Sequence, residues 1–432
     1  MNRPLKYKRR VIHISYLCGY KLIMAFTHRK IINDPVHGFI TINDPLIFEL
    51  INHPFYQRLR RIQQMALAQL VYPGAVHTRL HHSLGAYHLM CIAINELIDK
   101  GIEITKEEAQ AAKVAILLHD IGHGPFSHAL ENRLLKGVSH EDLSLLIMHQ
   151  LNDAPNPILK GNLNLAIQIF TNQYPKKFLH QLISGQLDVD RLDYLSRDSF
   201  FTGVSEGVVG YERILKMLTV HNNELVVEEK GINSVEKFLM SRRLMYWQVY
   251  QHKTVVASEN MLVKIIERAQ LLFQQKDEAV KTGNVLDYFL GEFNGDLKNI
   301  NLDAYCQLDD TDVLFAIKQW QKHTDPILSL LCNRLLNRNG FKCTMQSNPI
   351  SATQWEQAYQ LVKSKFPFED NDLAFLCFKG TASNTLYKND NETIKILLKS
   401  GEISSISQIQ NALIIESLSA PVKKFYICLL ND

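Results

Sequence analysis

Residues 117–128 read LLHDIGHGPFSH, and this stretch places three histidines and an aspartate around two glycines and a proline. The apolar helical pattern before it ends at His119 and Asp120. Taken alone, the stretch has a simple structural interpretation, because glycine commonly ends a helix and histidine is tolerated there. The other histidines and acids of the chain therefore decide what the stretch does.

The composition indicates a globular protein of a reducing compartment. The chain has 432 residues, 46% hydrophobic and 21% charged, so it is long enough to bury a sizeable core. Seven scattered cysteines form no CxxC pair: Cys18, Cys91, Cys306, Cys332, Cys343, Cys377 and Cys428. This pattern argues against a disulfide scaffold and a cysteine–zinc site, and we expect a cytoplasmic protein.

The first residues carry a charge that the rest of the chain lacks. Residues 1–23 hold six Lys or Arg and no acid, and without them 41 basic residues face 44 acidic ones. Nucleic acid is therefore not the expected partner. Lys21 interrupts the apolar run of a secretory signal, and no stretch has the length of a membrane span. We expect residues 1–29 to be a basic extension, with Met24 as the biological start.

Helical periodicity dominates the pattern up to about residue 275. Helices are predicted at 44–71, 82–100, 106–119, 125–136, 140–152, 176–184, 188–198, 208–219, 234–250, 254–275 and 310–338. Residues 218–231 predict a β-hairpin, because Asn222 and Asn223 separate two β-prone runs. The predicted fold is mainly α, with a helical core at 30–275, a small β-hairpin and a less regular α+β region at 276–432. We expect the last region to pack on the core or on other subunits.

Candidate metal ligands come from separate segments that helices can bring together. HTRLHHSLG offers His82 where a helix begins, and DVDRLDYLSRD offers Asp190. His119 and Asp120 add one imidazole and one carboxylate at a helix end. Two imidazoles and two carboxylates suit Mn, Fe, Ni, Zn or Mg, with positions left for water or phosphate oxygens. Nothing in the set selects among these metals.

A histidine, an HD pair and an aspartate in this order resemble the HD-domain phosphohydrolases. KIINDPVHGFI (30–40), FYQRLRRIQQ (55–64) and YPGAVHTRLHHSLG (72–85) look like the deoxynucleoside triphosphate triphosphohydrolase branch. The similarity runs from Lys30 to about Lys253, and a weaker similarity follows near residues 305–342. It implies water attack at the α-phosphorus of a dNTP, which releases deoxynucleoside and inorganic triphosphate. It also implies a homo-oligomer, a tetramer or a hexamer.

The resemblance assigns roles around the phosphates. It implies that His123, His128 and His140 act there, with Glu131 orienting His128. Pro125 is expected to start a helix, which would put His128 and Glu131 on one face. A histidine suits protonation of a leaving oxygen near neutral pH. The alternative is a polar network that only ties helices together.

DVDRLDYLSRD gives a geometric test of the same site. On a helix, Asp190, Tyr194 and Asp198 share one face and span about 12 Å, which can reach from the α-phosphate to the sugar of one nucleotide. The resemblance implies that Tyr194 and Asp198 contact the sugar together with Gln64. We also expect Arg79 to bind the α-phosphate. The alternative for Asp198 is an exposed acid at a helix end.

A second stripe, SRRLMYWQVYQHK, places Arg242, Tyr246 and Tyr250 four residues apart. By the resemblance, Arg242 reaches the outer phosphates, as does Arg191, where the family usually has lysine. Tyr250 and Met65 would face each other beside the 2′ carbon of the sugar and would exclude ribonucleotides by steric clash. Core packing is the alternative for this stripe, and Tyr246 is expected in the core.

Residues upstream of the catalytic motifs point to an activating nucleotide. In the family this neighbourhood helps to bind one between subunits, and Ile31, Asn33, Gln57 and Arg60 match the family pattern. Asn52 stands where the animal enzyme has an acidic residue that recognises a guanine edge. An amide offers one acceptor and one donor group, which suits adenine better, so dATP is the expected activator. The alternative is an ordinary surface turn in an enzyme that needs no activator.

Two other functions fit parts of the pattern. An HD-domain phosphodiesterase or nucleotidase acting on another phosphorylated substrate would use the same metal ligands. A nucleic-acid-binding regulatory protein could keep the fold without turnover, although the acidic body argues against it. The sugar-facing set of Gln64, Tyr194 and Asp198 favours the nucleotide as substrate.

Overall fold

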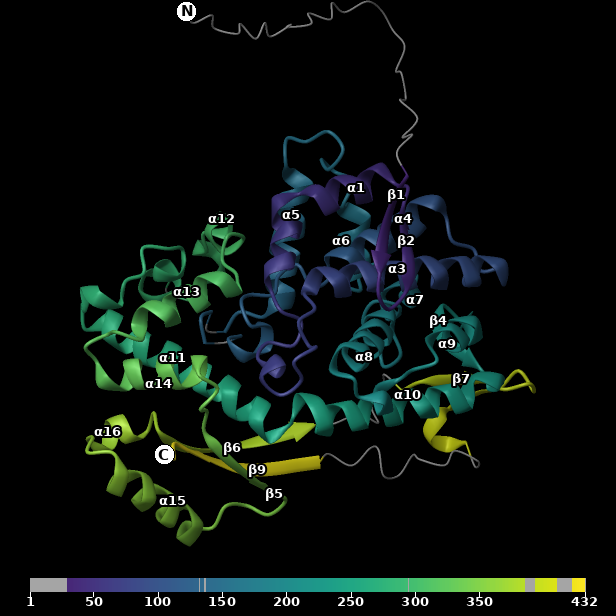
Figure 1. The fold of residues 1–432 in the computed structure, drawn as a ribbon. Coiled ribbons are helices and arrows are strands. Elements are labelled where there is room, and N and C mark those ends of the chain that lie inside the picture. The colour runs from purple at the N-terminus through teal and green to yellow at the C-terminus, as the bar shows by residue number, and fades with distance from the viewer. Residues whose placement is uncertain are drawn as a thin grey trace, which may run out of the picture.

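The computed structural model describes residues 29–131, 133–135, 137–293, 295–384, 393–409 and 422–431. Helices dominate this part of the chain, which confirms the predicted mainly α fold (Figure 1). Apart from Arg29, the predicted basic extension and its expected start at Met24 lie outside the described residues.

A short pair of strands comes first in the described chain, helices follow, and the remaining strands lie between and after them. The α-helices are α1 (Pro45–Asn52), α2 (Pro54–Gln57), α3 (Arg79–Asp99), α4 (Lys106–Leu118), α5 (His140–Asp153), α6 (Asn164–Phe170), α7 (Lys177–Gln181), α8 (Val189–Thr202), α9 (Tyr211–Met217), α10 (Ile232–Met245), α11 (Lys253–Gln274), α12 (Leu302–Tyr305), α13 (Asp310–Trp320), α14 (Pro326–Leu336), α15 (Ala352–Lys365) and α16 (Asp370–Leu373). The strands are β1 (Lys30–Asp34), β2 (Gly38–Ile42), β3 (Leu218–His221), β4 (Glu224–Glu228), β5 (Lys342–Gln346), β6 (Cys377–Asn384), β7 (Lys395–Leu397), β8 (Ile403–Ser405) and β9 (Val422–Leu429).

Three helices build the part of the core that carries the site. α3 packs against both α4 and α8. α4 begins at a capping box, in which the side chains of Thr105 and Glu108 each accept from the other residue's backbone N–H. Gly85 lets α8 approach α3 closely, because a Cβ there would lie 2.0 Å from the Asp193 carboxylate. This packing brings the starts of α3 and α8 to the end of α4.

The chain after α4 is a loop, and the helix predicted at 125–136 is wrong. Among the described residues of this segment, helical backbone forms only as a 3-10 turn at Ser127–Ala129, and Phe126 and Ser127 have positive φ angles of 53° and 49°. A long-range contact helps to hold these left-handed residues, because the backbone N–H of Phe126 donates to Asp310 at 2.7 Å. Local periodicity carries no information about such a contact.

Prolines divide two of the predicted helices. The helix predicted at 44–71 ends at Asn52, since the residue before Pro54 avoids helical backbone, and only short helical turns follow. The helix predicted at 310–338 is two helices, because Pro326 begins α14. The helix predicted at 234–250 forms as α10 and passes into the π-helical turn η6 (Tyr246–Tyr250).

Three small sheets lie around the helices. The predicted hairpin is confirmed: β3 pairs with β4 across Asn222 and Asn223, which both have positive φ. The C-terminal strands β7 and β8 extend it, with β7 parallel to β4. The hairpin β1–β2 was not predicted, and β5, β9 and β6 form the third sheet. Apolar side chains from both halves of the chain form one core, and no helix of the described part is long and apolar enough to span a membrane.

Candidate metal centre and substrate cavity

The four predicted metal ligands converge where α3, α4 and α8 meet. The Nε2 atoms of His82 and His119 are 3.4 Å apart. Each lies near Oδ1 of Asp190, at 3.0 Å for His82 and 3.4 Å for His119. An oxygen of Asp120 lies 3.4 Å from His119 Nε2. The structure therefore gathers His82, His119 and Asp190 into one group that could hold a metal ion, and Asp120 lies beside this group.

Hydrogen bonds on the far side of each imidazole aim the Nε2 atoms at this point. His82 Nδ1 lies 2.7 Å from Asp193 Oδ2, and His119 Nδ1 donates to the Ile116 carbonyl at 2.6 Å. Metal-binding histidines usually have such a partner, which fixes the ring and its tautomer. Donor type, convergence and orientation together fit a divalent cation.

Burial and mutual attraction set the charges of this cluster. Burial alone would lower the pKa of His82, but hydrogen bonds with Asp190 and Asp193 raise it to about 10. Burial also opposes ionisation of Asp120, yet His119 and Arg79 hold the pKa of that carboxyl well below its usual range. The carboxylates of Asp120 and Asp190 are thus ionised and attract positive charge to this point, and a bound cation would displace the proton from His82, since a ligating imidazole is neutral.

Arg79 lies beside the ligand cluster and lines the cavity next to it. Its guanidinium pairs with Asp120 and donates from Nε to Ser127 Oγ at 2.8 Å. The side chain is almost fully buried, so water screens its charge poorly. An anion beside the metal ligands would meet this charge.

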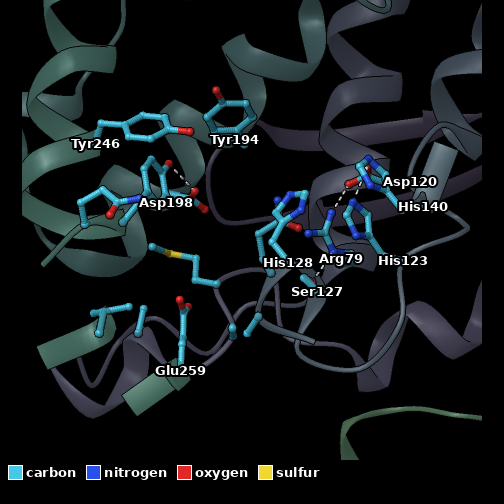
Figure 2. A pocket seen from close by; sticks show the side chains of 18 of the residues that line it. Arg79, Asp120, His123, Ser127, His128, His140, Tyr194, Asp198, Tyr246 and Glu259 are labelled. Carbon is cyan, nitrogen blue, oxygen red and sulfur yellow. Dashed lines mark hydrogen bonds and ion pairs between the residues drawn. The ribbon is translucent and has the colours of Figure 1, made fainter. Parts of the chain in front are cut away.

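A second cluster combines the loop after α4 with the start of α5 (Figure 2). Glu131 lies 2.7 Å from His128 Nδ1 and 2.6 Å from His140 Nδ1. His123 stacks on His140, with ring centroids 3.9 Å apart. Burial alone would raise the pKa of Glu131, but hydrogen bonds from His128 and His140 hold it well below its usual range. An ionised carboxylate only accepts, so both Nδ1 atoms donate and leave the Nε2 atoms for a ligand.

Both clusters open into one cavity of about 450 Å³ (Figure 2). The predicted site residues that line it are Gln64, Met65, Arg79, Asp120, His123, His128, His140, Asp190, Tyr194, Asp198 and Tyr250. His82, His119 and Glu131 do not line the cavity but contact residues that do. The volume falls in the range of small-molecule binding sites.

One face of α8 forms a wall of the cavity, and Asp190, Tyr194 and Asp198 lie along it. Asp198 is 2% exposed, so its alternative interpretation as an exposed helix-end acid is wrong. Its oxygens lie 2.6 Å from His77 Nε2 and 2.6 Å from the Tyr250 hydroxyl. These two partners fix the carboxylate in the wall.

Three predicted placements differ from the structure. Neither Arg191 nor Arg242 lines the cavity, and Arg191 donates to Asp188 at 2.7 Å. Tyr246 was expected in the core but lines the cavity beside Tyr250, with ring centroids 5.4 Å apart. Both tyrosines belong to the π-helical turn η6, whose wider turn a regular helical pattern does not describe.

The residues predicted to bind an activator lie outside the cavity. They occupy β1 and the segment from α1 to η1 (Arg58–Arg61), and they are Ile31, Asn33, Asn52, Gln57 and Arg60. Asn52 is exposed, and its amide donates to the Phe48 carbonyl at 2.8 Å. Arg60 Nε donates to Gln57 at 2.7 Å. Within one chain this surface is therefore separate from the cavity.

Three acids that matter for the site were not predicted from the sequence. Asp193 accepts from Arg197 and contacts His82, and its position one turn after a ligand acid could have indicated it. Asp310 accepts from the backbone N–H of Phe126 in the loop after α4, and no local signal identifies it. Glu259 lines the cavity from α11, where it is an acid within an apolar run.

Two protein-family models match this chain. One, described as HD domain, matches residues 79–198, which include all four candidate metal ligands. The other, described as HD associated region, matches residues 209–286. The two matches cover most of the residues that line the cavity, and the exceptions lie in the segment Gln64–Ala68.

Similar proteins span nearly the whole chain. A phosphohydrolase of Bacteroides thetaiotaomicron with a crystal structure is 46% identical, has a TM-score of 0.88 and is matched over 94% of this chain and 100% of its own. YwfO of Bacillus subtilis, which is uncharacterized, is 34% identical over 91% of this chain and 90% of its own. The deoxynucleoside triphosphate triphosphohydrolase SAMHD1 of Gallus gallus is 28% identical over 57% of this chain and 46% of its own length. This chain thus spans about half of that last relative.

Proposed function

Because this chain belongs to the HD-domain phosphohydrolase family, we propose that it hydrolyses dNTPs to deoxynucleosides and inorganic triphosphate. One observation carries the proposal. The wall formed by Asp190, Tyr194 and Asp198 joins the metal ligands to polar groups about 12 Å away in the same cavity. The side chains at both ends shorten this span, so it can take a nucleotide from its α-phosphate to its sugar.

The phosphate end of the cavity holds the positive charge. A divalent ion would be held by His82, His119, Asp120 and Asp190, and when bound it polarises a phosphoryl oxygen. Mn, Fe, Ni, Mg and Zn all suit these donors. Arg79 binds the α-phosphate and neutralises the charge that develops there during attack. His123 and His140 contact the remaining phosphate oxygens. Arg191 and Arg242 would reach the outer phosphates only by leaving their present positions.

His128 supplies the proton for the leaving group. A bond forms between the attacking water and the α-phosphorus, and the bond from that phosphorus to O5′ of the sugar breaks. His128 gives its Nε2 proton to O5′ while Glu131 holds Nδ1–H, and the water releases one proton to solvent. The water oxygen thus ends in the triphosphate.

The sugar end of the cavity selects deoxyribose. The amide oxygen of Gln64 is buried without a hydrogen-bond partner in the described structure, and a sugar hydroxyl would donate to it. Asp198 has lone pairs left for the 3′-hydroxyl, and Tyr194 lies beside it on α8. Met65 and Tyr250 occupy the space beside the 2′ carbon, so contact with these side chains excludes ribose.

We extend the proposal to the assembly. Residues 30–275 form the catalytic core, and residues 276–432 pack on it within a homo-oligomer, a tetramer or a hexamer. The activator is dATP, which binds at the surface formed by Ile31, Asn33, Asn52, Gln57 and Arg60.

Product analysis tests the proposal. Each dNTP and NTP is incubated with the full-length protein and each metal, singly and in pairs, and the products are separated. Triphosphate and deoxynucleoside should appear in equal amounts, only from dNTPs, and dATP should stimulate turnover of the others. Release of single phosphates would support a phosphodiesterase or nucleotidase instead. Additive rates in every pair would show that none of these nucleotides activates the enzyme.

A further inference from the structure

We propose that Glu259 reads the nucleobase of the substrate by accepting a hydrogen bond from an exocyclic amino group. The inference rests on the proposed function and goes beyond it to base selectivity. Glu259 lines the cavity together with Val255, which lies four residues earlier on the same face of α11. Figure 2 shows the carboxylate directed into the cavity, apart from Asp120 and His123 at the phosphate end.

Glu259 differs from the other acids of the cavity wall. Asp120, Asp190 and Asp198 each have a protein partner that neutralises or fixes the carboxylate. Within the described part of the chain, Glu259 forms no hydrogen bond and no ion pair, and burial is the sole cause that raises its pKa, to about 8. The side chain is half-buried, and an ionised carboxyl group without a partner is unfavourable there, so a ligand that donates to it would be bound preferentially.

Glu259 lies on the side of the cavity that is away from the phosphate end, as Asp198 does (Figure 2). Asp190 marks the phosphate end, and Asp198 lies about 12 Å further along α8. A nucleobase projects from the sugar away from the phosphates, and Met65, Val255 and Glu259 are among the residues that line this cavity. Apolar side chains suit the faces of a base, and a carboxylate suits a donor on its edge.

Hydrogen-bond chemistry then predicts which bases are preferred. Donation from an amino group of a base favours the ionised carboxyl, which accepts and cannot donate, and the competition below is run above pH 8, where Glu259 is ionised without a ligand as well. Cytosine and adenine carry an amino group on the edge that glutamate reads in nucleic acids, whereas thymine, uracil and guanine carry a carbonyl oxygen at the corresponding ring position. Glu259 therefore favours dCTP over dUTP, two nucleotides with the same sugar, phosphates and ring.

Competition between these two nucleotides measures the selectivity directly. The full-length protein receives an equal mixture of dCTP and dUTP with metal and a constant amount of dATP. The ratio of released deoxycytidine to deoxyuridine then gives the ratio of their kcat/KM values in one state of activation. Wild type should favour deoxycytidine roughly tenfold, the discrimination of one good hydrogen-bonded contact to a base.

Two substitutions test the role of the carboxylate. In Glu259→Gln the amide can both donate and accept, and Glu259→Leu can do neither, so both should bring the ratio close to one while deoxyuridine release persists. Glu267→Gln is the matched control, because Glu267 lies on α11 but pairs with Arg133 and Lys264 outside the cavity. That variant should keep the wild-type ratio.

The outcomes separate this inference from the proposed function. A ratio that stays at the wild-type value in both Glu259 variants, with triphosphate still formed, would overturn base reading alone. An equal loss of turnover on both nucleotides in both variants would also overturn it, since that is the result of a purely structural role. No triphosphate from either nucleotide in wild type would overturn the proposed function and this inference with it.

Discussion

At the scale of single residues, the metal assignment depends on two carboxylates. Replacing Asp120 or Asp190 with Ala removes a charged ligand. Metal affinity and the rate of hydrolysis should each fall by more than about 100-fold, because loss of a residue that only supports a ligand already lowers affinity or activity about 10- to 100-fold. Metal per chain is measured by elemental mass spectrometry beside the rate of hydrolysis. Asp153→Ala, an exposed acid at the end of α5, is the control. Wild-type metal content in Asp190→Ala would contradict the assignment.

A second prediction at this scale concerns proton donation. His128→Ala should lower kcat by roughly 100- to 10,000-fold while metal content and KM stay near their wild-type values, because a proton donor acts mainly in the transition state. Steady-state kinetics separate the two constants, and the exposed His149 on α5 supplies the control His149→Ala. If KM rose and kcat did not change, His128 would be a binding residue.

At the scale of elements, Asp310 is expected to hold the catalytic loop. Its two carboxylate oxygens accept from the backbone N–H of Gln63 and of Phe126, at 2.8 and 2.7 Å. Asp310→Asn puts an amide donor against one of these N–H groups, and the free energy of unfolding should fall by about 1–3 kcal/mol. Urea unfolding measures the change, with the exposed Asp303→Asn as control. An unchanged urea midpoint would show that the loop does not depend on Asp310.

The same loop shows what the sequence could and could not predict. The helices α3, α4 and α8 and the ligands on them were predictable, because their spacing is local: His119 and Asp120 are adjacent, and one face of α8 follows from a period of four. The loop conformation was not predictable, since Asp310 and Tyr305 hold it from far along the chain. The π-helical turn η6 was also missed, because a regular helical pattern does not reveal a change of pitch.

At the scale of the whole molecule, the C-terminal half completes the site instead of lying beside it. Arg58 donates to the carbonyls of Leu308 and Ile121, and Tyr305 donates to the Gly122 carbonyl. α11 lines the cavity with Glu259 and also packs against α14 and β5 (Figure 1). Residues 276–432 are therefore expected to be required for turnover by the helical core.

Attack of water at the α-phosphorus of a dNTP leaves the water oxygen in the triphosphate, so the fate of this oxygen identifies the atom that is attacked. Hydrolysis is run in water enriched in oxygen-18, and triphosphate and deoxynucleoside are analysed by mass spectrometry. The mechanism predicts one heavy oxygen in each triphosphate and none in the deoxynucleoside, because the sugar keeps its own O5′. Heavy oxygen in the deoxynucleoside, or in single phosphate with dNDP as the other product, would contradict it.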